Sequence, residues 1–175
     1  MHERAAEFAE RARDRYDVDL DVVEFDAGTK TAAAAADAVG CDTAAIASTI
    51  VVSLSGGDGG DGKDGAHEEG GGDEDRLVAA ITSGANRLDL DAVAERFGAA
   101  SAAMADPERI REVVGWSIGG VPPICHDAAL PTVFDPTLAK YDTVYGAAGT
   151  PSALFPIDPE TLADLAAATV VDLTE

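Results

Sequence analysis

The chain has 175 residues, 46% of them apolar, and its 33 acidic residues against 12 lysines and arginines give a net charge of −21. This composition predicts a single folded domain over residues 1–175, and no apolar run approaches the ~18 residues of a membrane span. The acids are scattered along the chain, which favours a surface adapted to concentrated salt over an acidic mimic that binds basic partners. The separated cysteines Cys41 and Cys125 indicate a cytoplasmic protein with free thiols.

The first quarter of the chain alternates helical and extended patterns. Residues 3–16 place apolar side chains near helical spacing, and Leu20–Phe25 alternates in the manner of a strand. Thr31–Val39 is rich in alanine and is followed by Gly40, a residue type that commonly ends helices. We therefore expect a helix, a short strand and a second helix in this order.

Residues 55–75 differ from the rest of the chain in composition. The segment holds nine of the 18 glycines, eight acidic residues and one lysine, so it cannot bury apolar surface, and we expect a disordered insertion. A glycine-rich calcium-binding repeat is the alternative, but the regular spacing of such repeats is missing. The flanking stretches Thr49–Leu54 and Leu77–Thr82 have the composition of strands, so the insertion is predicted to extend the tip of a hairpin.

Two helices with clear boundary signals follow. Asp89–Phe97 places its apolar residues on one side and is followed by Gly98. The next helix begins at Asp106, with Pro107 in the first helical position and an acid in the first turn, and is expected to run to about Val114.

The last third of the chain is predicted to contain three strands, a helix and a final short strand. Strands outnumber those of simple β-α-β alternation, which predicts an α+β fold (mixed α/β) with a central mixed β-sheet and flanking helices. A doubly wound parallel sheet is disfavoured for the same reason. The five expected elements are Thr132–Phe134, Thr143–Tyr145, Ala153–Ile157, Asp158–Ala167 and Val170–Leu173.

The glycine-rich loop Gly115–Pro123 is the strongest candidate for a binding site. Its paired glycines, Gly119 and Gly120, allow a ligand to approach the backbone and can present amide donors to a carbonyl or an oxyanion. An ordinary tight turn is the alternative that composition alone favours. A second loop, Gly146–Gly149, has only small side chains and is either the floor of a pocket or a turn.

Other motifs carry less weight. The chain has no G-x-S-x-G and no H-E-x-x-H motif, and Gly28–Thr31 lacks the upstream glycine spacing of a phosphate-binding loop. Cys125 and His126 are adjacent, and chain neighbours rarely point at a common atom, so an ordinary loop is favoured over a catalytic pair. The sequence therefore contains no standard nucleophile motif.

Seven segments, taken in order, carry a family resemblance: Thr31–Gly40, Ala45–Val52, Ile81–Phe97, Met104–Pro107, Gly115–Pro123, Leu130–Asp135 and Val144–Gly149. Together they resemble the YbaK/prolyl-tRNA synthetase-associated domain family, the free-standing aminoacyl-tRNA editing deacylases. The resemblance covers almost the whole chain, rests on the order and spacing of the segments, and tolerates the insertion at 55–75. It implies the fold of that family and an activity that hydrolyses the ester joining a wrong amino acid to the 3′ end of a tRNA.

The resemblance also implies a site around Gly119, Gly120 and Pro123, where the loop holds the substrate near its scissile carbonyl. An activated ester needs orientation beside a water and donors to the oxyanion, so no cofactor and no metal are expected. Ser48 stands where the family commonly has a functionally important lysine, and its neutral hydroxyl binds a phosphate or carbonyl more weakly than an ammonium. Gly119, Gly120 and Ser48 form the predicted catalytic set, and the predicted substrate-binding residues are Lys30, Ile118, Pro122, Pro123, Asp135 and Gly149.

The expected partner is the acceptor end of a mischarged tRNA, with an aminoacyl-tRNA synthetase as a second expected partner and no role for a membrane or DNA. A net charge of −21 repels phosphate, but concentrated salt screens this repulsion, and Arg109 and Arg111 are the nearest cations before the glycine loop. Because Ser48 replaces the lysine, a non-catalytic domain of the same fold that binds an aminoacyl group, a tRNA 3′ end or a synthetase is the alternative function.

Overall fold

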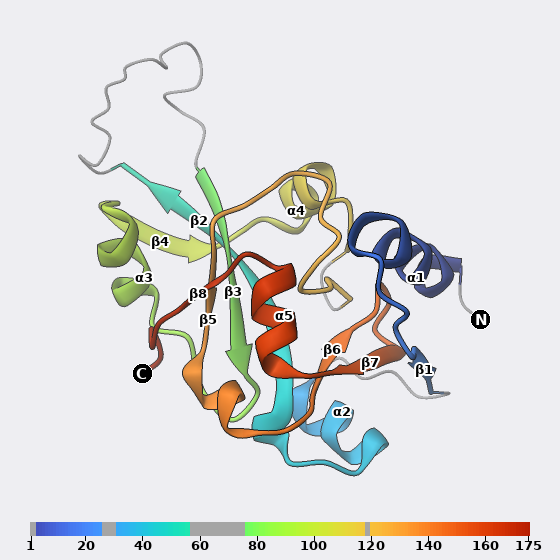
Figure 1. Ribbon diagram of the computed structural model, residues 1–175. Coiled ribbons are helices and arrows are strands. Elements are labelled where there is room, and N and C mark those ends of the chain that lie inside the picture. Colours follow the sequence, from blue (N-terminus) through green and yellow to red (C-terminus); the bar gives the residue numbers. More distant parts are fainter. Residues whose placement is uncertain (1–2, 26–30, 57–75, 118–119) are drawn as a thin grey trace.

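The computed structural model describes residues 3–25, 31–56, 76–117 and 120–175, and its centre is a mixed β-sheet flanked by helices (Figure 1). The strand order is β1-β7-β6-β2-β3-β5-β8, with β4 paired to β2 outside this path. The sheet combines parallel and antiparallel pairs, which confirms the predicted α+β fold. The strands are β1 (Val23–Glu24), β2 (Ile46–Ser55), β3 (Arg76–Ser83), β4 (Ser101–Met104), β5 (Thr132–Phe134), β6 (Val144–Ala147), β7 (Ala153–Ile157) and β8 (Thr169–Val170).

The helices form where local boundary signals are strong. Asp89 caps α3 by accepting hydrogen bonds from two backbone amides, and Gly98 ends this helix in the left-handed conformation that glycine adopts without steric cost. The predicted helices are confirmed, although the last one ends at Leu165 and not near Ala167. The α-helices are α1 (Glu3–Tyr16), α2 (Ala32–Val39), α3 (Leu90–Phe97), α4 (Pro107–Val114) and α5 (Pro159–Leu165).

The two longest strands, β2 and β3, pair antiparallel from Ala47 opposite Ser83 to Leu54 opposite Arg76. This pairing confirms the predicted partnership of the two strands. β2 begins earlier than predicted, at Ile46, because its first residues also pair in parallel with β6. The core of the predicted insertion, residues 57–75, lies outside the described residues.

Other predicted strand boundaries are wrong where pairing, and not local composition, sets the strand length. The strand predicted at Leu20–Phe25 is reduced to β1, because the chain pairs with β7 only at Val23 and Glu24. The final strand is Thr169–Val170 and not Val170–Leu173, because these two residues are the ones that pair with β5. β4 was not predicted, since its sequence Ser-Ala-Ala-Met has low strand propensity, and it forms by pairing with the end of β2.

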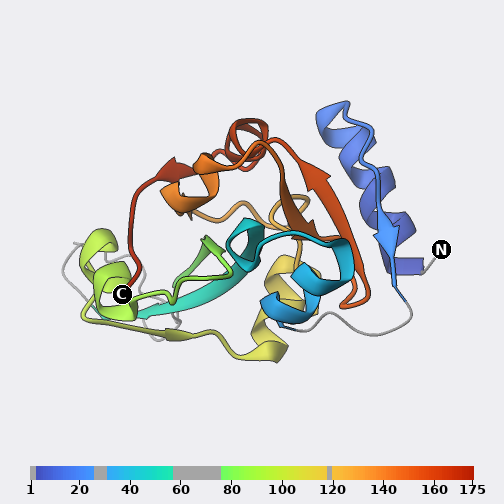
Figure 2. The same ribbon diagram turned by 90° about the horizontal axis from the view of Figure 1, so that it is seen from below.

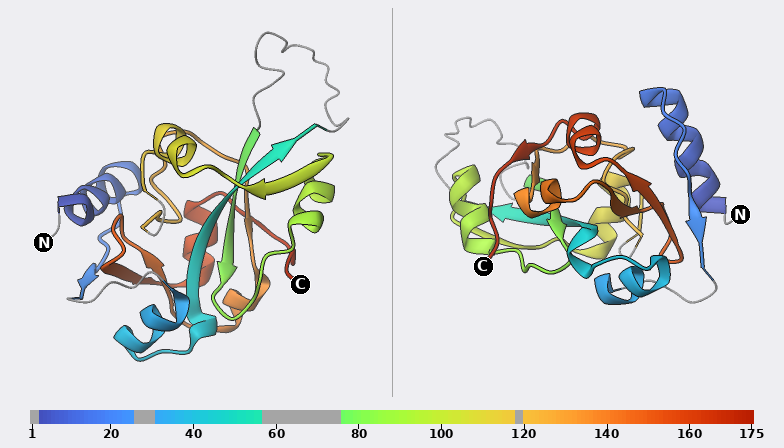
Figure 3. Two further views of the ribbon diagram at one scale, coloured as in Figure 1. Left: turned by 180° about the vertical axis from the view of Figure 1, so that it is seen from behind. Right: turned by 60° about the horizontal axis from the view of Figure 1, so that its bottom comes forward.

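Alternate residues of β2 face two different apolar layers, as the two-residue period of a strand requires. Val51 belongs to the larger core, which also holds Phe8 of α1, Ile110 of α4 and Leu162 of α5. Val52 belongs to a smaller core that includes residues of α3. Accordingly, α1 and α3 lie at opposite ends of the molecule (Figures 1 and 3). Among the described helices, none has the length and apolar character needed to cross a membrane.

Candidate active site

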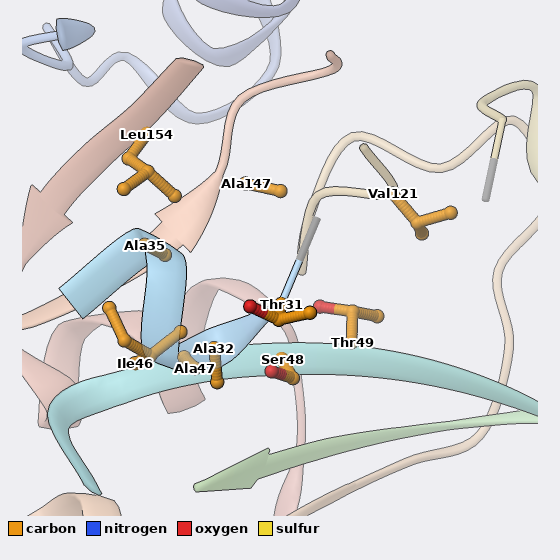
Figure 4. A pocket seen from close by; sticks show the side chains of 10 residues that line it. All are labelled: Thr31, Ala32, Ala35, Ile46, Ala47, Ser48, Thr49, Val121, Ala147 and Leu154. Carbon is orange, nitrogen blue, oxygen red and sulfur yellow. The ribbon is translucent and has the colours of Figure 1, made fainter. Parts of the chain in front are cut away.

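A cavity of about 170 Å³ lies where the N-terminal end of α2, the start of β2, the loop after α4, and strands β6 and β7 meet (Figure 4). Figure 2 shows the ribbon of α2 next to the start of β2. Uncharged side chains from elements far apart in the sequence line it. The described lining residues are Thr31, Ala32, Ala35, Ile46, Ala47, Ser48, Thr49, Val121, Ala147 and Leu154.

The N-terminal end of α2 forms one wall of this cavity because the helix starts there. Thr31 is the cap, and its Oγ1 accepts a hydrogen bond from Ala34 N at 3.1 Å. Ala32 and Ala35 then present methyl groups to the cavity, so the helix occupies little of the space in front of β2. The alanine-rich composition of α2 therefore helps to keep the cavity open.

Ser48 and Thr49 both border the cavity, but they differ in direction. Figure 4 shows their side chains pointing to opposite sides of β2, with Thr49 on the side of Thr31 and Val121. The Thr49 hydroxyl oxygen is buried and has no hydrogen-bond partner within the described part of the chain. A buried hydroxyl without a partner is costly, which makes Thr49 the lining residue with the greatest unmet demand for a polar ligand atom.

A second, smaller cavity of about 110 Å³ adjoins the first at Thr49 and Val121, which line both. Apart from Thr49, its described lining is apolar, with Val51, Ala105 and Ile110 among the contributors. Thr49 thus stands where a space with hydroxyl groups in its lining meets an apolar one. A ligand that carries a polar group next to a short aliphatic group matches this change of character.

Gly120 is buried at the edge of the loop wall, and the structure gives a packing reason for glycine at this position. A Cβ atom on Gly120 would lie 2.7 Å from the backbone nitrogen and Cα of Thr150. The Gly120 amide donates to Ser117 O at 3.0 Å. The loop after α4 therefore touches the loop after β6 backbone to backbone, and this contact sets the position of Val121 in the cavity wall.

The remaining loop residues predicted to bind substrate lie behind that wall. Pro122 and Pro123 are buried. Pro123 packs closely against Gly146, since a Cβ atom on Gly146 would lie 3.2 Å from Pro123 Cδ. Gly149 has a φ of +93°, and a Cβ there would lie 2.7 Å from the ring of Trp116. None of these three residues lines the cavity, and the structure places them in the packing behind its wall.

Asp135 also has a structural place away from the cavity lining. Its buried carboxylate accepts hydrogen bonds from Ser83 N at 3.0 Å, Asn86 Nδ2 at 2.9 Å and Thr137 N at 2.9 Å. These bonds join the end of β3 to the 3-10 turn Pro136–Lys140. Lys30, Ile118 and Gly119 lie outside the described residues, and neither Arg109 nor Arg111 lines the cavity.

The adjacent Cys125 and His126 do not form a nucleophile–base pair. Burial raises the pKa of the Cys125 thiol to about 11, so the thiol stays protonated at neutral pH. The ring of His126 is directed elsewhere, with Nε2 2.7 Å from Pro122 O. The sequence-based preference for an ordinary loop over a catalytic pair at this position agrees with this geometry.

The described lining supplies hydroxyl groups and backbone but no acid, base or charged nucleophile. Within residues 3–25, 31–56, 76–117 and 120–175, no three histidine, cysteine, aspartate or glutamate side chains gather in a way that could hold a metal ion. Sequence reasoning missed Thr31, Thr49 and Val121. Period-two alternation along β2 could have identified Thr49, because it shares a face with the core residue Val51.

Comparison with known proteins places this geometry in a family. The family model described as the aminoacyl-tRNA editing domain matches residues 26–165 of the chain. The chain therefore belongs to the aminoacyl-tRNA editing domain family. The matched stretch contains every described residue that lines the cavity.

The chain is also similar to individual proteins. A solved structure described as a candidate trans-editing enzyme for prolyl tRNA synthetase is 35% identical, with a TM-score of 0.83 over 100% of this chain and 99% of that chain. A scaffold protein used in the computational grafting of linear epitopes is 32% identical, with a TM-score of 0.82 over 100% and 99% of the two chains. The uncharacterized protein YwhH of Bacillus subtilis (strain 168) is 26% identical over 147 residues, which are 82% of this chain and 80% of that protein.

Proposed function

We propose that the protein is a hydrolase that removes the amino acid from mischarged tRNA, and that the cavity between α2, β2 and the Gly120–Val121 loop holds the aminoacyl ester. The observation that carries this proposal is the cavity itself. Within a chain of the aminoacyl-tRNA editing domain family, its lining includes Val121 from the glycine loop, Ser48, and Thr49, whose hydroxyl has no partner among the described residues. The tRNA 3′ end is the expected ligand.

The reaction needs few protein groups. Water adds to the ester carbonyl carbon, the bond between that carbon and the ribose oxygen breaks, and the ribose oxygen takes up a proton, which releases the amino acid and a tRNA with a free 3′ end. Positioning the ester supplies much of the rate enhancement, and the vicinal ribose hydroxyl can assist the proton transfer. The Thr49 hydroxyl both donates and accepts hydrogen bonds, so it is suited to hold the ester carbonyl or the α-ammonium of the substrate.

The cavities favour a small, uncharged aminoacyl group. An apolar cavity of 150 Å³ in another protein accommodates benzene, whereas the apolar space here is about 110 Å³. This smaller volume favours a side chain smaller than an aromatic ring, and a charged side chain would be buried without a charged partner in the described lining. Alanine, serine and valine esters are expected to be better substrates than phenylalanine or lysine esters.

A single-turnover deacylation assay tests this function. Five tRNAs, charged with alanine, serine, valine, phenylalanine or lysine, are incubated with the protein in molar potassium chloride, which screens the repulsion between phosphate and a chain of net charge −21. Hydrolysis of at least one small aminoacyl ester well above the spontaneous rate is expected. Uniform absence of hydrolysis contradicts the proposal.

The alternative function is a non-catalytic domain that binds an aminoacyl-tRNA end or a synthetase. It is favoured by the uncharged described lining and by Ser48 at the position where the family resemblance leads us to expect a lysine. Tight binding of one aminoacyl-tRNA together with no hydrolysis of any of the five would support this alternative. The same five substrates in a filter-binding assay therefore separate the two functions.

A further inference from the structure

The rear side of the glycine loop is held by one face of α1. Four side chains of this helix, which we call the α1 clamp, bond to the backbone at both ends of the stretch from 115 to 127: Arg4 to Gly115 O, Arg11 to Cys125 O, Arg15 to His126 O and Tyr16 to Cys125 N. Figure 1 shows α1 beside this stretch. In each of the four contacts, the two bonded residues are more than a hundred positions apart in the sequence.

Trp116 lies at the centre of the clamp and is fully buried. Phe8 meets its ring edge to face at 6.1 Å, and the guanidinium carbons of Arg4 and Arg11 lie 4.1 and 5.2 Å from its ring centroid. The indole nitrogen donates to Cys125 O at 2.9 Å, which ties the two ends of the loop together. This residue is the only tryptophan of the chain, so its fluorescence reports on this one place.

The clamp holds the backbone at Cys125 in an unusual conformation. Cys125 has a φ of +69°, in the left-handed region that residues with a Cβ rarely adopt. Its carbonyl accepts from both Trp116 Nε1 and Arg11 Nη1, and its amide donates to the Tyr16 hydroxyl at 3.3 Å. Such a conformation persists only when surrounding contacts determine it.

A short path of packing contacts connects the clamp to the cavity. Gly149 lies against the Trp116 ring and against Arg4 O. The next residue, Thr150, lies against the backbone of Gly120, which precedes Val121 of the cavity wall. A shift of Trp116 would therefore be passed to the wall through Gly149 and Thr150.

We propose that α1 is a positioning element for this site and that Arg11 is its principal positioning residue, a role that rests on the proposed deacylase function. Arg11 joins three groups at once: Cys125 O at 3.4 Å, Asp127 Oδ1 at 2.8 Å and Glu7 Oε2 at 2.9 Å. Only a planar guanidinium spans such a set, and a lysine ammonium does not. The helix lies outside residues 26–165, the stretch that the family model matches.

The test compares Arg11→Gln with Arg13→Gln in the full chain. Arg13 lies on the same helix but is 57% exposed and pairs with Asp19, which is 85% exposed, so it is a matched control. We measure single-turnover hydrolysis of the best substrate, acrylamide quenching of Trp116 fluorescence, and thermal unfolding by circular dichroism. For Arg11→Gln we expect at least a tenfold lower maximal rate at little changed KM and stronger quenching, while Arg13→Gln behaves as wild type.

The outcomes separate the two proposals. A wild-type rate and wild-type quenching in Arg11→Gln overturn the positioning role, as does a rate that falls only in proportion to the unfolded fraction. If Arg11→Gln does not fold, Arg11→Lys and Tyr16→Phe replace it, and wild-type rates in both also overturn the role. If the wild type hydrolyses no tRNA, the deacylase function fails, and the quenching of Trp116 in Arg11→Gln against Arg13→Gln still decides whether the clamp holds the loop.

Discussion

The two sides of the loop that follows α4 differ sharply in charge. On the cavity side, Val121 joins threonine, serine and small aliphatic side chains, and no charged residue lines the space within the described chain. On the rear side, Arg4, Arg11 and Arg15 bond to backbone carbonyls of the same loop. Positive charge in this region therefore serves to hold the backbone, and the neutral side is left for the ligand.

The positively charged residues of the chain are few, and α1 holds a large share of them. α1 carries four of the 12 lysines and arginines within 14 residues. Arg11 forms ion pairs with Glu7 and Asp127, so its charge is balanced within the protein and does not extend far toward a polyanionic ligand. We infer that α1 contributes to order in the loop more than to the attraction of tRNA.

The substitution Gly120→Val is expected to have the largest effect, because it forces the loop after α4 away from the loop after β6. The new side chain would collide with the Thr150 backbone, so Val121 would leave the cavity wall. We expect a loss of at least about 100-fold in single-turnover deacylation and a lower melting temperature. Ala129→Val, at an exposed position, is the control. A Gly120→Val rate near wild type would show that the wall is not part of the site.

Thr49→Val changes only the cavity side of the loop, because it replaces the hydroxyl of Thr49 in the lining with a methyl group. The substitution removes a buried hydroxyl that has no partner among the described residues, so the melting temperature should stay the same or rise, while deacylation should fall about tenfold, equivalent to ~1.4 kcal/mol. In the control Thr132→Val, the lost hydroxyl does have a partner, Leu130 O at 2.9 Å, so stability should fall by about 1 kcal/mol. Lower stability in Thr49→Val would point to a structural role for the hydroxyl.

Changes at Ser48 should matter less, because its side chain points away from Val121 (Figure 4). Ser48→Ala removes one neutral hydrogen-bonding group, and we expect a cost of less than about 1 kcal/mol in the activation free energy of deacylation. Ser48→Lys should keep or raise the rate, since an ammonium forms a stronger hydrogen bond to a phosphate or carbonyl than a hydroxyl does. Single-turnover rates of both variants check this, and a larger loss in Ser48→Ala than in Thr49→Val would reverse the ranking of the two residues.

The smallest expected effect concerns pH and the rear side of the loop. Burial lowers the pKa of His126 below its ordinary 6.5, and Arg15 acts in the same direction, against the hydrogen bond to Pro122 O and the charge of Asp127. The folded state then binds fewer protons than the unfolded state, so the contribution of His126 to stability is present above about pH 6.5 and is lost as the pH falls through the lowered pKa. Thermal unfolding between pH 7.5 and 5 should show a shallower pH dependence in His126→Gln than in wild type. Parallel curves would contradict this assignment.

The sequence alone was sufficient for the parts of the structure that depend on near neighbours. Asp106 followed by Pro107 predicts the start of α4, because a cap satisfies amides only two or three residues away. The order and spacing of seven short segments also predicted the family, and the family model confirms it. The salt-adapted surface and the disordered insertion at 55–75 remain predictions from composition.

Only the tertiary structure decided what surrounds the cavity. The carboxylate of Asp135, a predicted substrate-binding residue, accepts hydrogen bonds from Ser83, Asn86 and Thr137, and Thr49 emerged as a buried hydroxyl without a partner among the described residues. Nothing near Arg11 in the sequence indicates its contact with Cys125 O, which is 114 residues away. Local patterns report on hydrogen bonds and apolar faces within an element, whereas burial, partner choice and strain at a loop depend on which distant elements pack together.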